Sequence, residues 1–226
     1  MELKKESMQI LKEKSRAKSQ ITFDEDFNVP DAKPDAGRLI QNKGRIIMDD
    51  VRLTDGKGIL TGNLQVDILY VGEERGIVSS LTAKLPFEET LNLKDIINGD
   101  KMCLKWEIED LTIRLIHSRK LNIKALVTFC ATVDETEQIR LPVVLDAEEV
   151  SVRKKTVRFL GLTVHKKDTL RIKDEYTIAS NRPDIASLIW YTMDVRGLDL
   201  KPEENVVKAR GELSVFVLYG AEDTEA

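Results

Sequence analysis

Residues 60–70 read Leu-Thr-Gly-Asn-Leu-Gln-Val-Asp-Ile-Leu-Tyr and place an apolar or small side chain at every second position. A period of two is typical of a half-buried β-strand. The end of this segment, 62–70, returns 149 residues later at 211–219 as Gly-Glu-Leu-Ser-Val-Phe-Val-Leu-Tyr. The chain therefore combines a β pattern with an internal repeat.

The repeat extends well beyond these strands, because residues 8–74 align with residues 157–223 without a gap. A second anchor is Lys33-Pro34-Asp35 followed by Leu39-Ile40, which returns as Arg182-Pro183-Asp184 followed by Leu188-Ile189. Self-similarity at a fixed spacing indicates a modular protein. We expect an N-terminal segment at 1–19, a first complete unit at 20–150, and a linker strand with the first half of a second unit at 151–226.

The alternation predicts a mainly β fold of antiparallel, sandwich-like repeat domains. Short helical turns are expected to begin at Pro34 and Pro183. Residues 1–18 have a helical composition, but their counterpart at 150–167 has a strand pattern, so we expect the first several residues to be frayed. The expected strands are 20–29, 45–53, 58–71, 77–85, 88–93, 102–115, 121–133, 141–145, 150–164, 169–178, 191–200 and 206–219.

The alternation also predicts which side chains form the core. Apolar residues are even-numbered from Met102 to Ile108 and odd-numbered from Leu111 to Leu115, so the phase slips near Glu109-Asp110. Such a slip predicts a β-bulge or a turn between two strands. The residues expected in the core are Leu64, Val66, Ile68, Trp106, Ile108, Ile123, Val127 and Phe129.

The second unit carries its own apolar face along the strand at 206–219. The side chains expected on that face are Ala209, Gly211, Leu213, Val215, Val217 and Tyr219. An uncovered apolar sheet face and a bare strand edge tend to recruit another chain. Two outcomes stay open: Leu213 and Val215 pack against residues 75–150, or the segment pairs with a second molecule as a homo-oligomer.

Composition excludes several classes. Hydrophobic residues make up 42% and charged residues 33% of the 226 positions, and no apolar run approaches the roughly 20 residues of a membrane span. The charged N-terminus has no secretory signal, which favours a cytoplasmic location. The net charge of −4, with acids and bases interleaved, argues against a nucleic-acid partner. Cys103 and Cys130 could form a disulfide, but two small apolar residues on strands in a reducing compartment are favoured.

No catalytic or cofactor motif stands out, and two histidines are too few for a histidine-rich metal site. Asp49-Asp50 near Asp55 could hold calcium or act on a glycan, but acidic residues flanking a hairpin loop explain them better. Trp190 and Tyr191 are adjacent on an expected strand, so at least one should face outward. This pair is the candidate partner-binding surface.

Four segments together resemble the SPOCS domain of spore coat and cortex morphogenetic proteins of clostridia. They are the Pro-Asp plus Leu-Ile segment, the Gly-x-Leu-x-Val-x-x-Leu-Tyr strand, Leu85-Pro86-Phe87-Glu88-Glu89, and Ser118-Arg119-Lys120-Leu121. The resemblance covers residues 20–133 and, as a beginning domain, 169–226. Proteins of this family carry several such domains followed by a LysM module, which this sequence lacks.

The resemblance implies a role in building the spore envelope, in the mother cell and at the forespore or spore surface, with spore coat morphogenetic proteins as partners. We therefore expect a non-catalytic structural or interaction module rather than an enzyme. The alternative is a carbohydrate-binding module that recognises peptidoglycan or another cell-wall glycan through the aromatic pair. Binding to insoluble peptidoglycan distinguishes the two.

Overall fold

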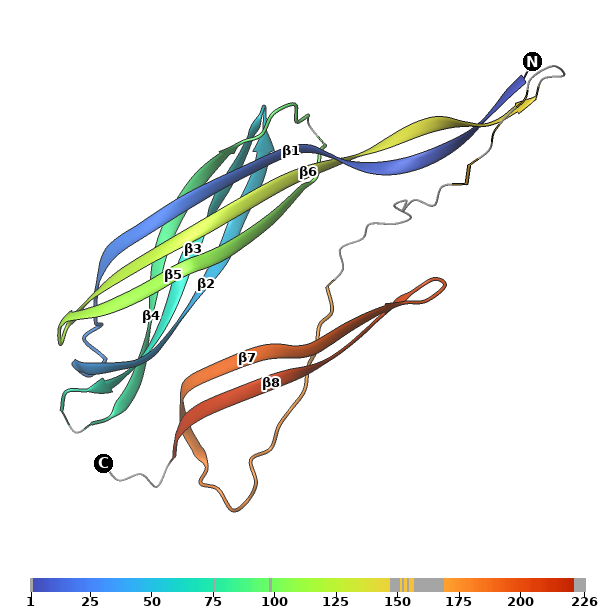
Figure 1. Ribbon diagram of the computed structural model, residues 1–226. Helices are drawn as coiled ribbons and strands as arrows, with labels where there is room; N and C mark the ends of the chain where they lie inside the picture. Colours follow the sequence, from blue (N-terminus) through green and yellow to red (C-terminus); the bar gives the residue numbers. More distant parts are fainter. Residues whose placement is uncertain are drawn as a thin grey trace.

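The computed structural model describes residues 2–74, 76–97, 99–146, 151, 153, 155–156 and 169–221. Within these residues the chain is all-β, as the alternation predicts, and no helix is present that could cross a membrane (Figure 1). The eight strands are β1 (Glu2–Asn28), β2 (Ala36–Thr54), β3 (Lys57–Gly72), β4 (Val78–Asn92), β5 (Met102–His117), β6 (Lys120–Asp146), β7 (Ile185–Pro202) and β8 (Val207–Ala221).

The first unit is a sandwich of two antiparallel three-stranded sheets, ordered β1-β6-β5 and β2-β3-β4. One apolar core fills the space between the sheets. Phe87 of β4 marks its centre, because its ring lies 6.2 Å from that of Phe23 on β1 and 5.2 Å from that of Phe129 on β6. Burial of large side chains from both sheets is the main source of the sandwich's stability.

The predicted core is confirmed on the inner strands and wrong at one residue. Leu64, Val66, Ile68, Ile123, Val127 and Phe129 are fully buried. Ile108 is half-buried, whereas Trp106 is 44% exposed. Trp106 pairs with Phe129, so it lies in phase with the core. β5 is an edge strand, however, so a neighbouring strand lies on only one side of the Trp106 ring.

The predicted bulge lies where the apolar phase slips, between Ile108 and Asp110. Glu109 is the extra residue. Its carboxylate accepts hydrogen bonds from Thr128 Oγ1 on β6 at 2.5 Å and from Gln20 Nε2 on β1 at 2.9 Å. The bulge therefore keeps the apolar residues inward and turns an acidic side chain across all three strands of the sheet.

Acid should weaken this carboxylate link. The hydrogen bond from Thr128 is the largest cause that lowers the pKa of Glu109 below its ordinary value of 4.5, followed by the bond from Gln20. A carboxyl whose pKa is lower in the folded than in the unfolded chain stabilises the fold at pH values above its unfolded-state pKa. This contribution to stability is lost as the pH falls through the folded-state pKa. We expect Glu109→Gln to reduce the fall in stability between about pH 5 and about pH 2, measured by urea unfolding. Glu107→Gln, at an exposed site on the same strand, should leave that dependence unchanged, and equal effects would contradict the link.

β1 and β6 continue past the sandwich as a two-stranded ribbon, the arm (Figure 1). It pairs residues 2–13 with residues 134–146, whereas β5 stops pairing with β6 at Val133. The frayed start expected for the N-terminus is therefore wrong, since cross-strand bonds hold these residues in a strand. Because the cross-strand pairing is continuous, the predicted strands 121–133 and 141–145 form the single strand β6. In the same way 77–85 and 88–93 form the single strand β4.

The two Pro-Asp turns have the same local structure, but the turns are not helical. The backbone N–H of Lys33 donates to the carbonyl of Pro30 at 2.9 Å, and Arg182 repeats this bond with Ala179 at 2.9 Å. The turn thus precedes each Pro-Asp pair, and a strand begins directly after it, at Ala36 and Ile185. Pro34 fixes φ in an extended segment here and does not start a helical turn.

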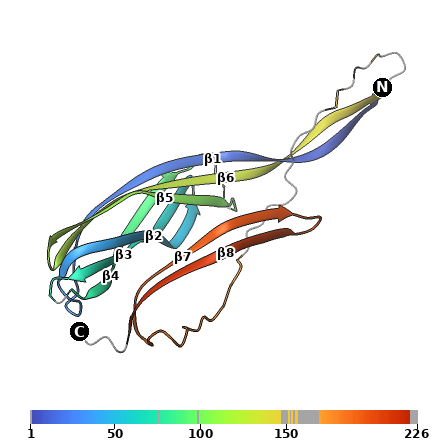
Figure 2. The same cartoon turned by 60° about the horizontal axis from the view of Figure 1, so that its bottom comes forward.

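The second unit reproduces only part of the first. β7 pairs with β8 as β2 pairs with β3. The register shifts after Ile185 and Leu188 lie at the positions equivalent to those after Ala36 and Leu39. No strand forms at the predicted 169–178, and the one predicted at 150–164 lies almost wholly outside the described residues. Leu213 and Val215 are exposed, so their predicted packing against residues 75–150 is wrong. β7 contacts the first unit instead, at β4 (Figure 2).

The alternative outcome, pairing of the second unit with a second molecule, stays a prediction. Leu213, Val215 and Val217 form one exposed apolar row on β8. We expect the purified chain to show a concentration-dependent rise in molar mass by light scattering, because such a face is costly to leave in water. Val215→Asp should lower that rise, and a strictly monomeric parent chain would contradict the prediction.

Candidate functional site

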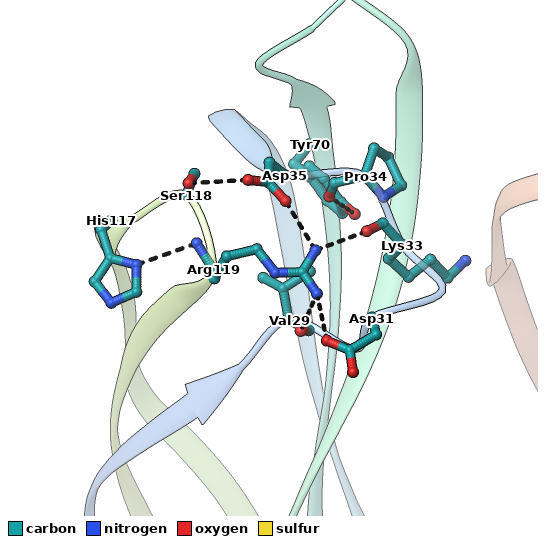
Figure 3. A network of polar contacts seen from close by, with 9 residues as sticks. All are labelled: Val29, Asp31, Lys33, Pro34, Asp35, Tyr70, His117, Ser118 and Arg119. Carbon is teal, nitrogen blue, oxygen red and sulfur yellow. Dashed lines mark hydrogen bonds and ion pairs between the residues drawn. The ribbon is translucent and has the colours of Figure 1, made fainter.

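Arg119, in the turn between β5 and β6, holds the densest polar network of the first unit (Figure 3). Its guanidinium donates to the carbonyl oxygens of Lys33 at 2.9 Å and Val29 at 3.1 Å. It also binds the carboxylates of Asp35 at 2.9 Å and Asp31 at 3.0 Å. Arginine suits this position because its planar fork can satisfy several acceptors at once. The bond to Asp35 is the largest cause that raises the pKa of Arg119 above its ordinary value.

Backbone bonds complete this connection, which we call the latch (residues 29–36 with 117–119). The N–H of Val29 donates to the carbonyl of Arg119 at 2.9 Å, and that of Ala36 to the carbonyl of Ser118 at 2.8 Å. Ser118 Oγ reaches Asp35 at 3.2 Å. The latch ties the segment between β1 and β2 to the β5–β6 turn, so it joins the two sheets at one end of the sandwich (Figure 3).

A buried tyrosine reinforces the latch. Tyr70 on β3 is fully buried, and its hydroxyl donates to the carbonyl of Pro34 at 2.9 Å. The second unit keeps this bond, because Tyr219 donates to the carbonyl of Pro183 at 3.4 Å. The repeated Pro-Asp and Leu-Tyr anchors of the sequence thus have one structural role, which is to fix the chain path into β2 and β7.

Replacing Arg119 by Lys should loosen the latch without unfolding the sandwich. A lysine ammonium cannot reach acceptors on both sides of the turn as the guanidinium does. We expect faster hydrogen exchange at the amides of Val29 and Ala36, measured by NMR, with the core amides of β3 unchanged. Arg114→Lys, at an exposed site on β5, is the control. Unchanged protection of both amides in Arg119→Lys would show that the network does not hold the turn.

The aromatic pair of the candidate surface lies beside a groove between the two units. Trp190 is only 5% exposed, whereas Tyr191 is 45% exposed. The groove has a volume of about 220 Å³ and is lined on the first unit by Lys43, Arg45, Gln65, Asp67, Ser80, Leu81 and Thr82, and on β7 by residues 188–191. The structure therefore brings Trp190 and Tyr191 next to polar side chains of the β2-β3-β4 sheet.

The other residues considered from the sequence do not gather into a site. Asp49 accepts a hydrogen bond from Asn63 at 2.7 Å, and Asp50 forms an ion pair with Arg52. Cys103 and Cys130 are free thiols. Across the described parts of the chain, no three His, Cys, Asp or Glu side chains are arranged to hold a metal ion.

Two features were missed from the sequence. In the sequence the Ser118-Arg119 step indicates only the entry to a long strand, and nothing in its spacing shows that Arg119 meets Asp31 and Asp35 more than eighty residues away. Leu69 belongs to a repeat anchor in the sequence, yet its side chain faces away from the core. A leucine between Asp67 and Val71, out of phase with the inward row, is the signal that could have identified it.

Comparison with protein families finds a match over part of the chain. Residues 35–116 match the family model described as SipL, SPOCS domain. No curated protein and no solved structure matches the chain. The match begins at Asp35 of the latch and extends through β2, β3, β4 and nearly all of β5. The resemblance identified in the sequence is thereby confirmed over this segment.

Proposed function

From the SPOCS domain at residues 35–116 we propose that this chain is a non-catalytic structural and interaction module of a spore-envelope assembly protein. The family match is the single observation that carries the proposal, since it points to sporulation. The hydrogen bonds that charged side chains make within the fold also support the proposal. Arg119, Lys124, Lys14 and Glu109 bind side chains on neighbouring segments, so these charges serve contacts within the fold.

The long strands supply surfaces that suit assembly. Among the described residues, the two outer edges of the arm have no paired strand, and Leu3, Leu11, Leu141 and Val143 are exposed on it. Open edges and apolar residues can add a strand from another protein. We propose spore coat morphogenetic proteins as the partners, and the mother cell and the forespore surface as the place where they meet.

Localisation tests the proposal. A fluorescent fusion of the chain, expressed in an endospore-forming bacterium during sporulation, should form a ring around the forespore. A fusion carrying Val66→Asp, which disrupts the core of the first unit, should stay diffuse in the mother cell at equal abundance. Diffuse fluorescence of the unaltered fusion throughout sporulation would refute the assembly role.

A second candidate function is binding of peptidoglycan or another cell-wall glycan. The observation that favours it is the groove, where Tyr191 and Trp190 lie beside Gln65, Asp67 and Thr82. Glycan sites commonly combine an aromatic face with hydrogen-bonding side chains. Sedimentation of the chain with insoluble peptidoglycan tests this function. Binding that Tyr191→Ala and Gln65→Ala each reduce would favour the glycan site, and no sedimentation of the parent chain would exclude it.

A further inference from the structure

Leu69 is buried on the side of its sheet that faces away from the core. It lies on β3 between Asp67 and Val71, and its partners across the sheet are Gln41 and Ser80. The odd-numbered residues of this part of β3 point outward, and 65, 67 and 71 are half-buried. Leu69 is nevertheless only 6% exposed and does not belong to the apolar core. Leu69 is therefore an apolar side chain buried on the outer face of the sheet.

Trp190 is the matching residue on the second unit. Large apolar neighbours on the same strand, Leu188 and Met193, are well exposed, whereas Trp190 is buried and also stands outside the core. Among the described residues, Leu69 and Trp190 are the only two buried hydrophobic side chains that the core does not include. β7 contacts β4, and Trp190 lines the groove together with Ser80, the cross-strand partner of Leu69.

We propose that Trp190 anchors a fixed joint between the two repeat units, and that the outward face of β3 and β4 around Leu69 is its receptor. The partner of this surface is a repeat unit of the same chain that carries an aromatic side chain at this position. The first unit has Gln41 at the equivalent position, so only the second unit carries this tryptophan anchor. The evidence for the joint is the burial of Leu69 and Trp190, which is independent of the proposed function.

The surroundings of Trp190 set the character of the joint. Its indole Nε1 is buried without a hydrogen-bond partner, although Gln65, Ser80 and Thr82 lie along the same groove. An unpaired buried donor weakens a contact. Arg45 and Asp67, an ion pair of 3.3 Å, form the polar side of the groove. The joint should therefore open more readily than the sandwich core, and the two units should separate before either loses its strands.

Tryptophan fluorescence tests the joint in the full chain. The background is Trp106→Phe, which leaves Trp190 as the sole tryptophan. We expect a blue-shifted emission and weak quenching by acrylamide. Leu69→Asp, which places a charge on the proposed receptor face, should raise quenching to that of N-acetyltryptophanamide in water. Ile59→Asp puts the same charge on the same face of β3 away from the groove and should leave quenching low.

Two further measurements separate an open joint from a misfolded unit. In Leu69→Asp the circular dichroism and the hydrogen-exchange protection of Val66 and Val127 should match those of the parent. If that variant does not fold, Trp190→Ala replaces it and should increase the maximum dimension measured by small-angle X-ray scattering while the same amides stay protected. Quenching in the parent as strong as in N-acetyltryptophanamide, or a scattering profile unchanged in Trp190→Ala, would overturn the proposal.

Discussion

Val66→Asp is expected to abolish cooperative folding of the first unit. Val66 is fully buried on β3, and its partners in the ladder are Gly44 and Ala83, which offer no group to bind a carboxylate. An unpaired charge in apolar surroundings costs several kcal/mol, and losses above about 4 kcal/mol are a large share of a domain's total stability of about 5–15 kcal/mol. Urea unfolding followed by circular dichroism should show a lost or strongly shifted transition.

The repeat provides a matched control at Val215. It occupies the position of Val66 in the second unit, on the same kind of strand, but is 54% exposed. At dilution where the chain is monomeric, Val215→Asp should change the unfolding free energy by no more than about 0.5 kcal/mol, as is usual for exposed sites. Equal destabilisation by the two substitutions would mean that β8 is covered in solution, and two neutral substitutions would refute the position of the core.

The alternation of the sequence predicts the inner strands well, because a strand with one covered face has a single register that keeps its apolar residues inside. It even locates the bulge at Glu109. It fails at Trp106, since phase along a strand does not show whether that strand lies at a sheet edge. Pro86 explains another difference. It suggests a break, but β4 is an edge strand, where a missing N–H is tolerated, and the strand continues through it.

The sites are harder to predict because they depend on contacts between distant segments. The latch joins residues 29–36 to residues 117–119, and neither segment carries a motif that names the other. The N-terminal ribbon shows the same limit, since the composition of residues 2–13 favours a helix until β6 is present to pair with it. The adjacency of Trp190 and Tyr191 indicates that they lie on opposite faces of a strand, but not which face meets the first unit.

Gly62 is the position where the repeat should show the second large effect. A side chain there would collide with the carbonyl oxygen of Ile47 and come within 3.0 Å of the Phe87 ring. The close approach arises because β2 is irregular between Met48 and Asp50, directly opposite this glycine. A backbone oxygen and a core ring cannot both move aside cheaply. We expect Gly62→Ala to lower the unfolding free energy of the first unit by about 1–3 kcal/mol, the usual cost of overpacking.

Gly211, the same position in the second unit, separates crowding from the general effect of replacing glycine. The nearest atom to an added side chain there is the carbonyl oxygen of Arg196 at 3.3 Å, and no ring lies close. The Ala side chain restricts the unfolded chain equally at both sites, which by itself favours folding by about 0.4–1 kcal/mol. Gly211→Ala should therefore be neutral or slightly stabilising in urea unfolding. If Gly62→Ala and Gly211→Ala have the same unfolding free energy, Gly62 is not crowded by β2 and β4, and the close packing at this position would be contradicted.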